Sequence, residues 1–364
     1  MRTGISPVVA VALLALFAQA APSPEPQRNN RGGNRGNRGG NGGGGGGATA
    51  QEQAAQRPQG VTTAADGSTI LDMTADVNGL PLRFKVSGPA QAFVANSPVN
   101  TANPIQGAAA APNTPGTMGI NVLLHGDGGQ SFFDFPNQGV SAQGNLAGVA
   151  VLAPNENLFW GGGGGLQRTD GVAHAAAVAD LVTQMLPQVM SFNTSDVWFT
   201  GVSGGSLMLS GFMMPAHMEK FGNNTGVLLN CAAMEPQVPV TPASAAALAT
   251  KRVHYQTTQN ELAMLQPSIP RAVSAYEEVV QGQGLSADQI NALQTVDATP
   301  NGDHCAFDGQ GFVSGVQLMA ENYAAVMQPG GSGQVPGIGN VQTGVVGNEN
   351  IQFSGTGRKR DIVG

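Results

Sequence analysis

One serine in this chain lies between glycines in a setting that suits nucleophilic chemistry. Ser203 belongs to the segment GVSGG (201–205), after a short apolar run from Asp196 and before a Met-rich helical pattern over about 206–221. A strand, a G-x-S-x-G turn and a helix in that order describe a nucleophile elbow, which raises a serine hydroxyl above the edge of a parallel sheet. The start of the helix presents backbone N–H groups where an oxyanion would form. We therefore expect Ser203 to be a nucleophile and the N–H of Gly204 to be an oxyanion donor.

This motif alone does not establish a site in so glycine-rich a chain. With 53 glycines among 364 residues, G-x-S-x-G is expected by chance roughly 0.4 times. A glycine-rich turn is therefore the competing interpretation. A hydrolase also needs a second oxyanion donor, a base and an acid, which the rest of the chain must supply.

A second glycine-rich loop is the expected source of the other oxyanion donor. The apolar strand at 119–124 ends in the segment HGDGG (125–129), which resembles the His-Gly loop of esterases. The predicted donor is the N–H of Gly126 or of Asp127. The alternative is a glycine-rich loop in which His125 is structural.

His304 is the expected general base for Ser203. Three of the five histidines, His174, His217 and His254, fall inside helix or strand patterns and are expected to be structural. His304 instead lies in a Gly/Asp loop between the last predicted strand and the last predicted helix, where such a base belongs.

The acid that would orient His304 is less well determined. Glu261 follows the strand at 252–257 directly and is the preferred residue. Asp297 and Asp303 compete for the role, since the spacing excludes neither of them.

Strand and helix patterns alternate along the chain after an initial hairpin, in which 69–76 and 81–86 flank an Asn-Gly turn at 78–79. Strands are then expected at 119–124, 146–152, 196–200, 227–231, 252–257 and 293–296, and helices at 170–190, 206–221, 267–282, 286–294 and 311–327. Residues 91–116 are expected to be a long loop. This alternation predicts an α/β fold with a mostly parallel central sheet and helices on both faces.

From about residue 68 to 327 the chain resembles the α/β-hydrolase superfamily, specifically secreted esterases of the feruloyl-esterase and polyester-depolymerase type. The hairpin, the His-Gly loop, the elbow and the late histidine carry this resemblance. It implies an α/β-hydrolase fold with eight core strands, and hydrolysis of acyl esters through residues in the chain order Ser, acid, His. The chain departs from the family in two places: the acid is usually Asp rather than Glu261, and Asp180 stands alone where that group often has paired aspartates.

Aromatic residues follow the ends of two predicted strands: Phe132, Phe133, Phe135, Phe159 and Trp160. Loops after strands carry ligands in open α/β sheets. The expected substrate pocket therefore comprises His125, Phe132, Phe159 and Trp160, although these aromatic residues can equally pack the loops together. The glycine run at 161–165 matches no pattern.

Two cysteines lie after predicted strands at the same edge of the sheet as Ser203. Cys231 ends the strand after the elbow helix and Cys305 follows His304. In a secreted protein such a pair is expected to form a disulfide rather than two buried thiols. Closing a loop of 74 residues would stabilise the fold by about 4 kcal/mol.

The two ends of the chain differ in composition from its middle. Residues 1–20 have the pattern of a secretory signal peptide, 21–60 that of a disordered Gly/Arg/Asn-rich linker, 61–327 that of the hydrolase domain and 328–364 that of a flexible Gly-rich tail. Sequons at Asn193 and Asn223 predict glycosylation. A secreted, extracellular protein is expected, and association with the cell wall is an alternative. The basic run at 358–360 is either a dibasic processing site or a solvated charge run.

Charge limits the expected partners. Residues 61–356 contain seven Lys or Arg and twenty Asp or Glu, a net charge of −13. Such a surface disfavours nucleic acid and anionic membranes, so a neutral ester, small or polymer-linked, is the expected substrate of a monomer. No cofactor is expected, and no metal, because two cysteines and scattered histidines offer no ligand cluster. A serine peptidase and an inactive cell-wall-associated binding protein are the alternative functions.

Overall fold

A computed structural model describes residues 48–100, 104–134, 144–338 and 351–354. The expected signal peptide, the linker as far as residue 47, Phe135 and the basic run at 358–360 lie outside these residues. No helix in the described part of the chain is long and apolar enough to cross a membrane.

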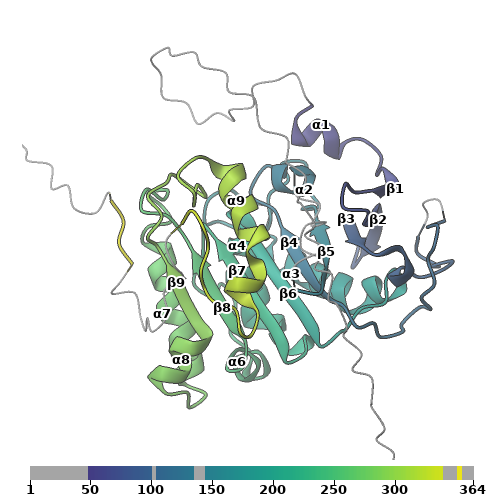
Figure 1. Ribbon diagram of the computed structural model, residues 1–364. Helices are drawn as coiled ribbons and strands as arrows, with labels where there is room; N and C mark the ends of the chain where they lie inside the picture. The colour runs from purple at the N-terminus through teal and green to yellow at the C-terminus, as the bar shows by residue number, and fades with distance from the viewer. Residues whose placement is uncertain (1–47, 101–103, 135–143, 339–350, 355–364) are drawn as a thin grey trace, which may run out of the picture. The chain divides into compact units, whose positions relative to one another are not determined.

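A nine-stranded sheet forms the centre of the domain, in the order β1-β2-β3-β5-β4-β6-β7-β8-β9 (Figure 1). The strands are β1 (Gly60–Thr63), β2 (Thr69–Val77), β3 (Leu80–Gly88), β4 (Gly119–Leu124), β5 (Leu146–Val151), β6 (Asp196–Val202), β7 (Asn224–Asn230), β8 (Arg252–Gln256) and β9 (Gln294–Asp297). The first three strands are antiparallel and β3 is antiparallel to β5, whereas the remaining pairs are parallel. The expected mostly parallel sheet is confirmed.

The register of the parallel strands brings their C-terminal ends to one edge of the sheet. Leu124 pairs with Gly201, and Val202 pairs with Asn230. Gln256, which pairs with Asn230, also pairs with Asp297 on its other side. The loops that follow β4, β6, β7, β8 and β9 therefore leave the sheet side by side, and every residue expected to do chemistry lies in one of them.

Helices cover both faces of the sheet, as expected. They are α1 (Ala50–Ala54), α2 (Gln130–Asp134), α3 (Gly171–Asp180), α4 (Gly204–Met208), α5 (Met214–His217), α6 (Pro242–Leu248), α7 (Ser268–Gln281), α8 (Ala287–Leu293), α9 (Phe312–Glu321) and α10 (Tyr323–Met327). Val122 and Leu124 belong to one apolar cluster, with residues of α3, α4, α5, α7 and α8. Leu123 points to the opposite face and joins residues of α1, α2, α9 and α10. This alternation along β4 is the period-two pattern of a strand buried on both faces.

The ordered part of the chain begins earlier than expected. Residues 48–60, assigned to the linker, contain α1 and the first residue of β1. Thr49 and Glu52 form a capping box at the start of α1, and Arg83 of β3 donates to the carbonyls of Gln53 and Gln56 at 3.1 and 3.2 Å. The linker boundary at residue 60 is therefore wrong. A helix cap and hydrogen bonds from the buried Arg83 hold this polar stretch in place, and its composition does not reveal these contacts.

Part of the expected flexible tail also packs against the domain. Val335 and Phe353 are buried, each in one of the two apolar clusters. The backbone N–H of Ser354 donates to the carbonyl of Gln259 at 2.8 Å. The described residues beyond 328 thus belong to the domain, because isolated apolar residues in a Gly-rich segment are enough to anchor it.

Candidate active site

Ser203 occupies the turn between β6 and α4. Its backbone has φ 49° and ψ −111°, a left-handed region that non-glycine residues seldom adopt and that costs on the order of 1–3 kcal/mol. A Cβ on Gly205 would lie 2.1 Å from the carbonyl oxygen of Leu124, so only glycine lets α4 start this close to β4. The local geometry is that of the expected nucleophile elbow.

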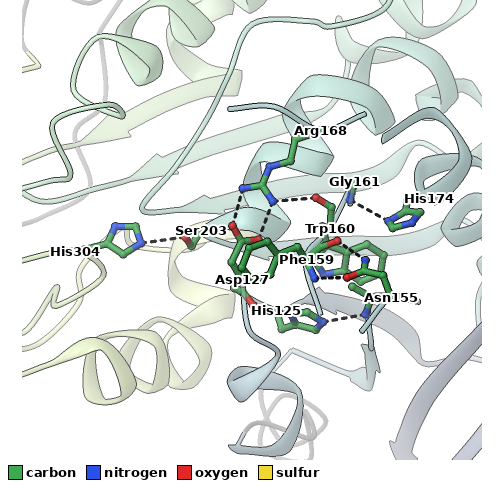
Figure 2. Close-up of polar contacts among 12 residues, drawn as sticks. His125, Asp127, Asn155, Phe159, Trp160, Gly161, Arg168, His174, Ser203 and His304 are labelled. Carbon is green, nitrogen blue, oxygen red and sulfur yellow. Dashed lines mark hydrogen bonds and ion pairs between the residues drawn. The ribbon is translucent and has the colours of Figure 1, made fainter. Parts of the chain in front are cut away.

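His304 lies beside Ser203 and links it to a buried carboxylate. The Nε2 atom of His304 is 3.0 Å from Oγ of Ser203, and its Nδ1 is hydrogen bonded to Oε1 of Glu261 (Ser203 and His304 are shown in Figure 2). Because a carboxylate accepts hydrogen bonds, Nδ1 carries the proton and Nε2 is free to accept from the serine hydroxyl. The three residues therefore form a continuous hydrogen-bonded row in the order required for base-assisted attack.

Glu261 is held in place at both of its oxygen atoms. Oε1 also accepts from the backbone N–H of Leu262 at 2.7 Å, and Oε2 accepts from Oγ1 of Thr257 at 3.2 Å. Its side chain is 0% exposed, whereas that of His304 is 20% exposed. A buried carboxylate with this set of donors fixes both the orientation and the tautomer of the imidazole.

The two competing carboxylates point elsewhere. Oδ1 of Asp297 accepts from the backbone N–H and the hydroxyl of Thr299, and its Oδ2 accepts from the side-chain amide of Gln256. Asp303 is exposed, and its backbone carbonyl accepts from the hydroxyl of Thr258. Among the described residues, Glu261 is the acid that contacts His304.

A disulfide joins Cys231 to Cys305, as expected. It ties the residue after β7 to the residue next to His304, so the loop that carries the imidazole is covalently attached to the sheet edge. The two sulfur atoms lie within 4.8 Å of the nearest His304 nitrogen. Since both sulfurs are in the disulfide, neither is a thiolate of the kind that binds metals.

The candidate oxyanion donors belong to the residue after Ser203 and to the loop after β4. A Cβ on Gly126 would be 3.5 Å from Cβ of Ser203, so the loop after β4 passes directly beside the serine. Within the described chain, the backbone N–H groups of Gly126, Asp127 and Gly204 donate to no protein acceptor. The N–H groups of Gly126 and Asp127, in the loop beside Ser203, and that of Gly204, the next residue of the chain, are therefore free to act as oxyanion donors.

His125 does not line a pocket, which corrects the expectation. It is fully buried, its Nδ1 donates to the carbonyl of Gly126 at 2.7 Å, and its Nε2 accepts from the N–H of Ala153 at 2.9 Å. Burial lowers its pKa to about 4, so the imidazole is neutral at pH 7. His125 ties the loop after β4 to the end of β5, which is the structural role first considered as the alternative.

Phe132 and Trp160 are also buried, and the expectation that they form pocket walls is wrong. Phe132 belongs to the core, with Nζ of Lys85 4.6 Å from its ring centroid. Trp160 lies between His125 and His174, at ring-centroid distances of 5.5 and 5.9 Å. A position after a strand end does not determine whether the side chain turns towards solvent or the core. Of the four expected pocket residues, Phe159 retains partial exposure.

One aromatic residue at the site was not expected from the sequence. Phe312 is the first residue of α9, and its ring centroid lies 6.1 Å from that of His304. Its Cζ would be 3.4 Å from a Cβ on Gly126, so the half-buried ring borders both the histidine and the oxyanion loop. The only signal in the sequence is its position eight residues after His304, at the start of an amphipathic helix.

The remaining candidate residues lie away from the row. His174, His217 and His254 are in α3, α5 and β8, as expected from their patterns. Asn193 and Asn223 lie in the loops that enter β6 and β7, at the edge of the sheet opposite Ser203. Both are accessible, so the structure is compatible with glycosylation at the predicted positions.

No protein-family model matches this sequence, and comparison with curated proteins gives no match either. Similar solved structures include Est1E from Butyrivibrio proteoclasticus, at 12% identity over 69% of this chain and 96% of that one, with a TM-score of 0.39. Another is acetyl xylan esterase from Aspergillus awamori, at 14% identity over 58% and 80%, with a TM-score of 0.39. A mutant of the feruloyl esterase module from Clostridium thermocellum is similar at 11% identity over 69% and 88%, with a TM-score of 0.42. The order of its strands, together with the elbow between β6 and α4, gives this chain the α/β-hydrolase fold.

Proposed function

We propose that this protein is a serine hydrolase that cleaves carboxylic esters through an acyl-enzyme. The observation that carries the proposal is the hydrogen-bonded row from Ser203 through His304 to Glu261, with the serine strained at the turn before α4. A nucleophile, a base in contact with it and a third group that orients the base are the parts that such catalysis needs.

In the proposed mechanism, Oγ of Ser203 attacks the ester carbonyl carbon while Nε2 of His304 takes the hydroxyl proton. The resulting oxyanion is stabilised by the N–H of Gly204 and by that of Gly126 or Asp127. His304 then gives its proton to the leaving alcohol as the C–O bond breaks. A water molecule then attacks the acyl carbon while His304 takes a proton from it. The bond between the acyl carbon and Oγ of Ser203 breaks, His304 returns the proton to Oγ, and the acid is released.

We infer that the ester is uncharged and carries an apolar group. Phe312 borders the reacting residues, and the partly exposed Phe159 lies in the loop after β5. The body of the protein is strongly acidic, which disfavours anionic substrates. Small esters and polymer-linked esters both meet these requirements.

The test is reaction of the purified protein with a fluorescent fluorophosphonate, beside Ser203→Ala and His304→Ala. Labelling of the wild type that is lost in both variants is expected, followed by turnover in a panel of esters from acetyl to feruloyl. A folded wild type that is not labelled would refute the proposal and favour the inactive binding protein. Labelling combined with cleavage of peptides rather than esters would favour the peptidase.

We further propose that the protein is secreted, since its first 20 residues have the pattern of a signal peptide and a disulfide is present. N-terminal sequencing of protein from the culture medium is expected to begin at Ala21. Recovery of the protein inside cells with an intact N-terminus would contradict this proposal.

A further inference from the structure

The glycine run at 161–165 belongs to the loop between Trp160 and Arg168, which is closed by backbone hydrogen bonds (Trp160, Gly161 and Arg168 are labelled in Figure 2). The N–H of Asp170 donates to the carbonyl of Gly161 at 2.8 Å, and the N–H of Gly161 donates to Nδ1 of His174 at 2.9 Å. Between these closing contacts the chain places Arg168 next to Asp127 (Figure 2). The loop that contains the glycine run thus places the buried, positively charged side chain of Arg168 beside the candidate site.

Arg168 donates hydrogen bonds to Asp127 from both of its terminal nitrogen atoms. Nη1 and Nη2 donate to Oδ1 and Oδ2 at 2.7 and 2.8 Å, and Nη1 also donates to the carbonyl of Trp160 at 2.9 Å. The Arg168 side chain is 1% exposed and that of Asp127 is 25% exposed. Bidentate pairs of this kind fix relative orientation as well as distance.

This ion pair lies against the residue that follows the nucleophile. A Cβ on Gly204 would be 2.0 Å from Oδ1 of Asp127 and 3.3 Å from Nη1 of Arg168. Asp127 also belongs to the loop that carries the other candidate oxyanion donor. One ion pair therefore adjoins both groups of backbone N–H that would hold the oxyanion.

We propose that Arg168 is a positioning residue, which fixes the oxyanion hole by holding Asp127 against Gly204. This inference rests on the proposed function of the same site. Arg168 is too deeply buried to reach the substrate, so its effect passes through the backbone of the two loops. Preorganised donors need no rearrangement when charge develops, and a displacement of about 1 Å at a reacting centre can lower the rate about 100-fold.

A second buried ion pair in the same chain provides a matched control. Arg83 donates to both oxygens of Asp72 at 3.0 and 2.7 Å, and both side chains are buried. This pair joins β2 to β3, on the antiparallel side of the sheet, and contacts no residue of the Ser203 row. Arg83→Gln removes a buried bidentate arginine whose side chain donates to Asp72, Gln53 and Gln56 rather than to residues 125–129, although its guanidinium lies 5.8 Å from the ring of Phe132 in α2.

The experiment compares Arg168→Gln with Arg83→Gln in the full secreted protein, using p-nitrophenyl acetate as the substrate. We expect Arg168→Gln to lower kcat about 10- to 100-fold with less than about threefold change in KM, because the loss is confined to the transition state. Arg168→Lys keeps the positive charge but loses the bidentate guanidinium, so its kcat is expected to lie between those of the wild type and Arg168→Gln. Arg83→Gln is expected to keep kcat within about twofold of the wild type, even if its urea midpoint falls by as much as that of Arg168→Gln.

Hydrogen exchange of the peptide that covers residues 125–129 provides a readout independent of activity. Faster exchange in Arg168→Gln than in Arg83→Gln supports the inference, and equal exchange together with equal kcat overturns it. If Arg168→Gln does not fold, kcat and the exchange of residues 125–129 are measured in Asp127→Asn, because that side chain is partly exposed and the replacement keeps its shape. A lower kcat with faster exchange supports the inference, and wild-type values of both overturn it. A wild type that no fluorophosphonate labels would refute the proposed function, whereas the exchange data would still decide whether Arg168 positions the loop.

Discussion

Glu261 accepts a hydrogen bond from Nδ1 of His304 although 43 residues of chain separate them. Glu261 lies in the loop after β8 and its side chain is fully buried, so its negative charge adjoins the imidazole that contacts Ser203. Replacing it with the isosteric amide removes that charge and permits the wrong tautomer. We expect Glu261→Gln to lower kcat by about 10²–10⁴-fold, with a smaller effect on KM, as measured by steady-state hydrolysis of p-nitrophenyl esters.

Asp303→Asn is the control for this prediction, since Asp303 is exposed and precedes His304 directly, whereas Nδ1 of His304 donates to Glu261. Its kcat is expected to stay within about threefold of the wild type. Equal losses in the two variants, or a greater loss in Asp303→Asn, would show that the acid has been assigned to the wrong residue.

The sequence was enough to predict that Ser203, Glu261, His304 and the two cysteines lie at one edge of the sheet, because each belongs to a loop that follows a parallel strand. Parallel strands bring such loops to one edge, so chain order and strand ends determine which residues can meet. The same rule left Asp297 and Asp303 as alternatives to Glu261. Only the structure distinguishes them, because hydrogen bonds to Thr299 and Gln256 turn Asp297 away.

The direction of a side chain was not predictable in the same way. Phe132 and Trp160 follow strand ends as Phe159 does, but the first two point into the core. Arg168 was missed because its partner is 41 residues earlier and a glycine turn brings them together. Features that depend on packing between distant loops leave no periodic signal in one sequence.

The disulfide between Cys231 and Cys305 is expected to support both stability and activity. In the chain-entropy model, a loop of 74 residues contributes about 4 kcal/mol to the free energy of unfolding. Cys305 adjoins His304, so its release also frees the loop that holds the imidazole. We expect the double variant Cys231→Ala/Cys305→Ala to have a lower urea midpoint and a lower kcat. Unchanged values in both measurements would contradict this role.

Phe312 is expected to determine which acyl or alcohol groups the site accepts. Its ring borders His304 and the oxyanion loop without a hydrogen bond to either. Removing the ring in Phe312→Ala is expected to raise KM for aromatic esters about three- to tenfold, which corresponds to the loss of one aromatic contact. The KM for acetyl esters should change less.

Val313→Ala is the matched control for Phe312→Ala, since Val313 is the next residue of α9 and is 50% exposed. We expect its KM values to equal those of the wild type for both kinds of ester. A Phe312 variant that discriminates between the esters no differently from the wild type would remove this residue from the substrate site.

Because His125 and His254 are fully buried, we expect the free energy of unfolding to decrease in mild acid. Burial lowers the pKa of His125 to about 4 and that of His254 to about 3, whereas an exposed histidine in the unfolded chain has a pKa of about 6.5. Between these values the unfolded state binds more protons than the native state, so stability falls as the pH decreases below 6.5. Each histidine is expected to remove about 2 kcal/mol from the free energy of unfolding between pH 7.5 and pH 5.

Urea unfolding at these two pH values measures the loss. In His254→Gln the difference between pH 7.5 and pH 5 is expected to be about 2 kcal/mol smaller than in the wild type, whatever the absolute stability of the variant. Val253→Ala, a destabilising change in the same buried strand, should retain the full wild-type difference because it removes no titrating group. If His254→Gln instead kept the wild-type pH dependence, the imidazole would have to be charged or solvated in the native state. That result would contradict its complete burial between Thr295 and Gln256.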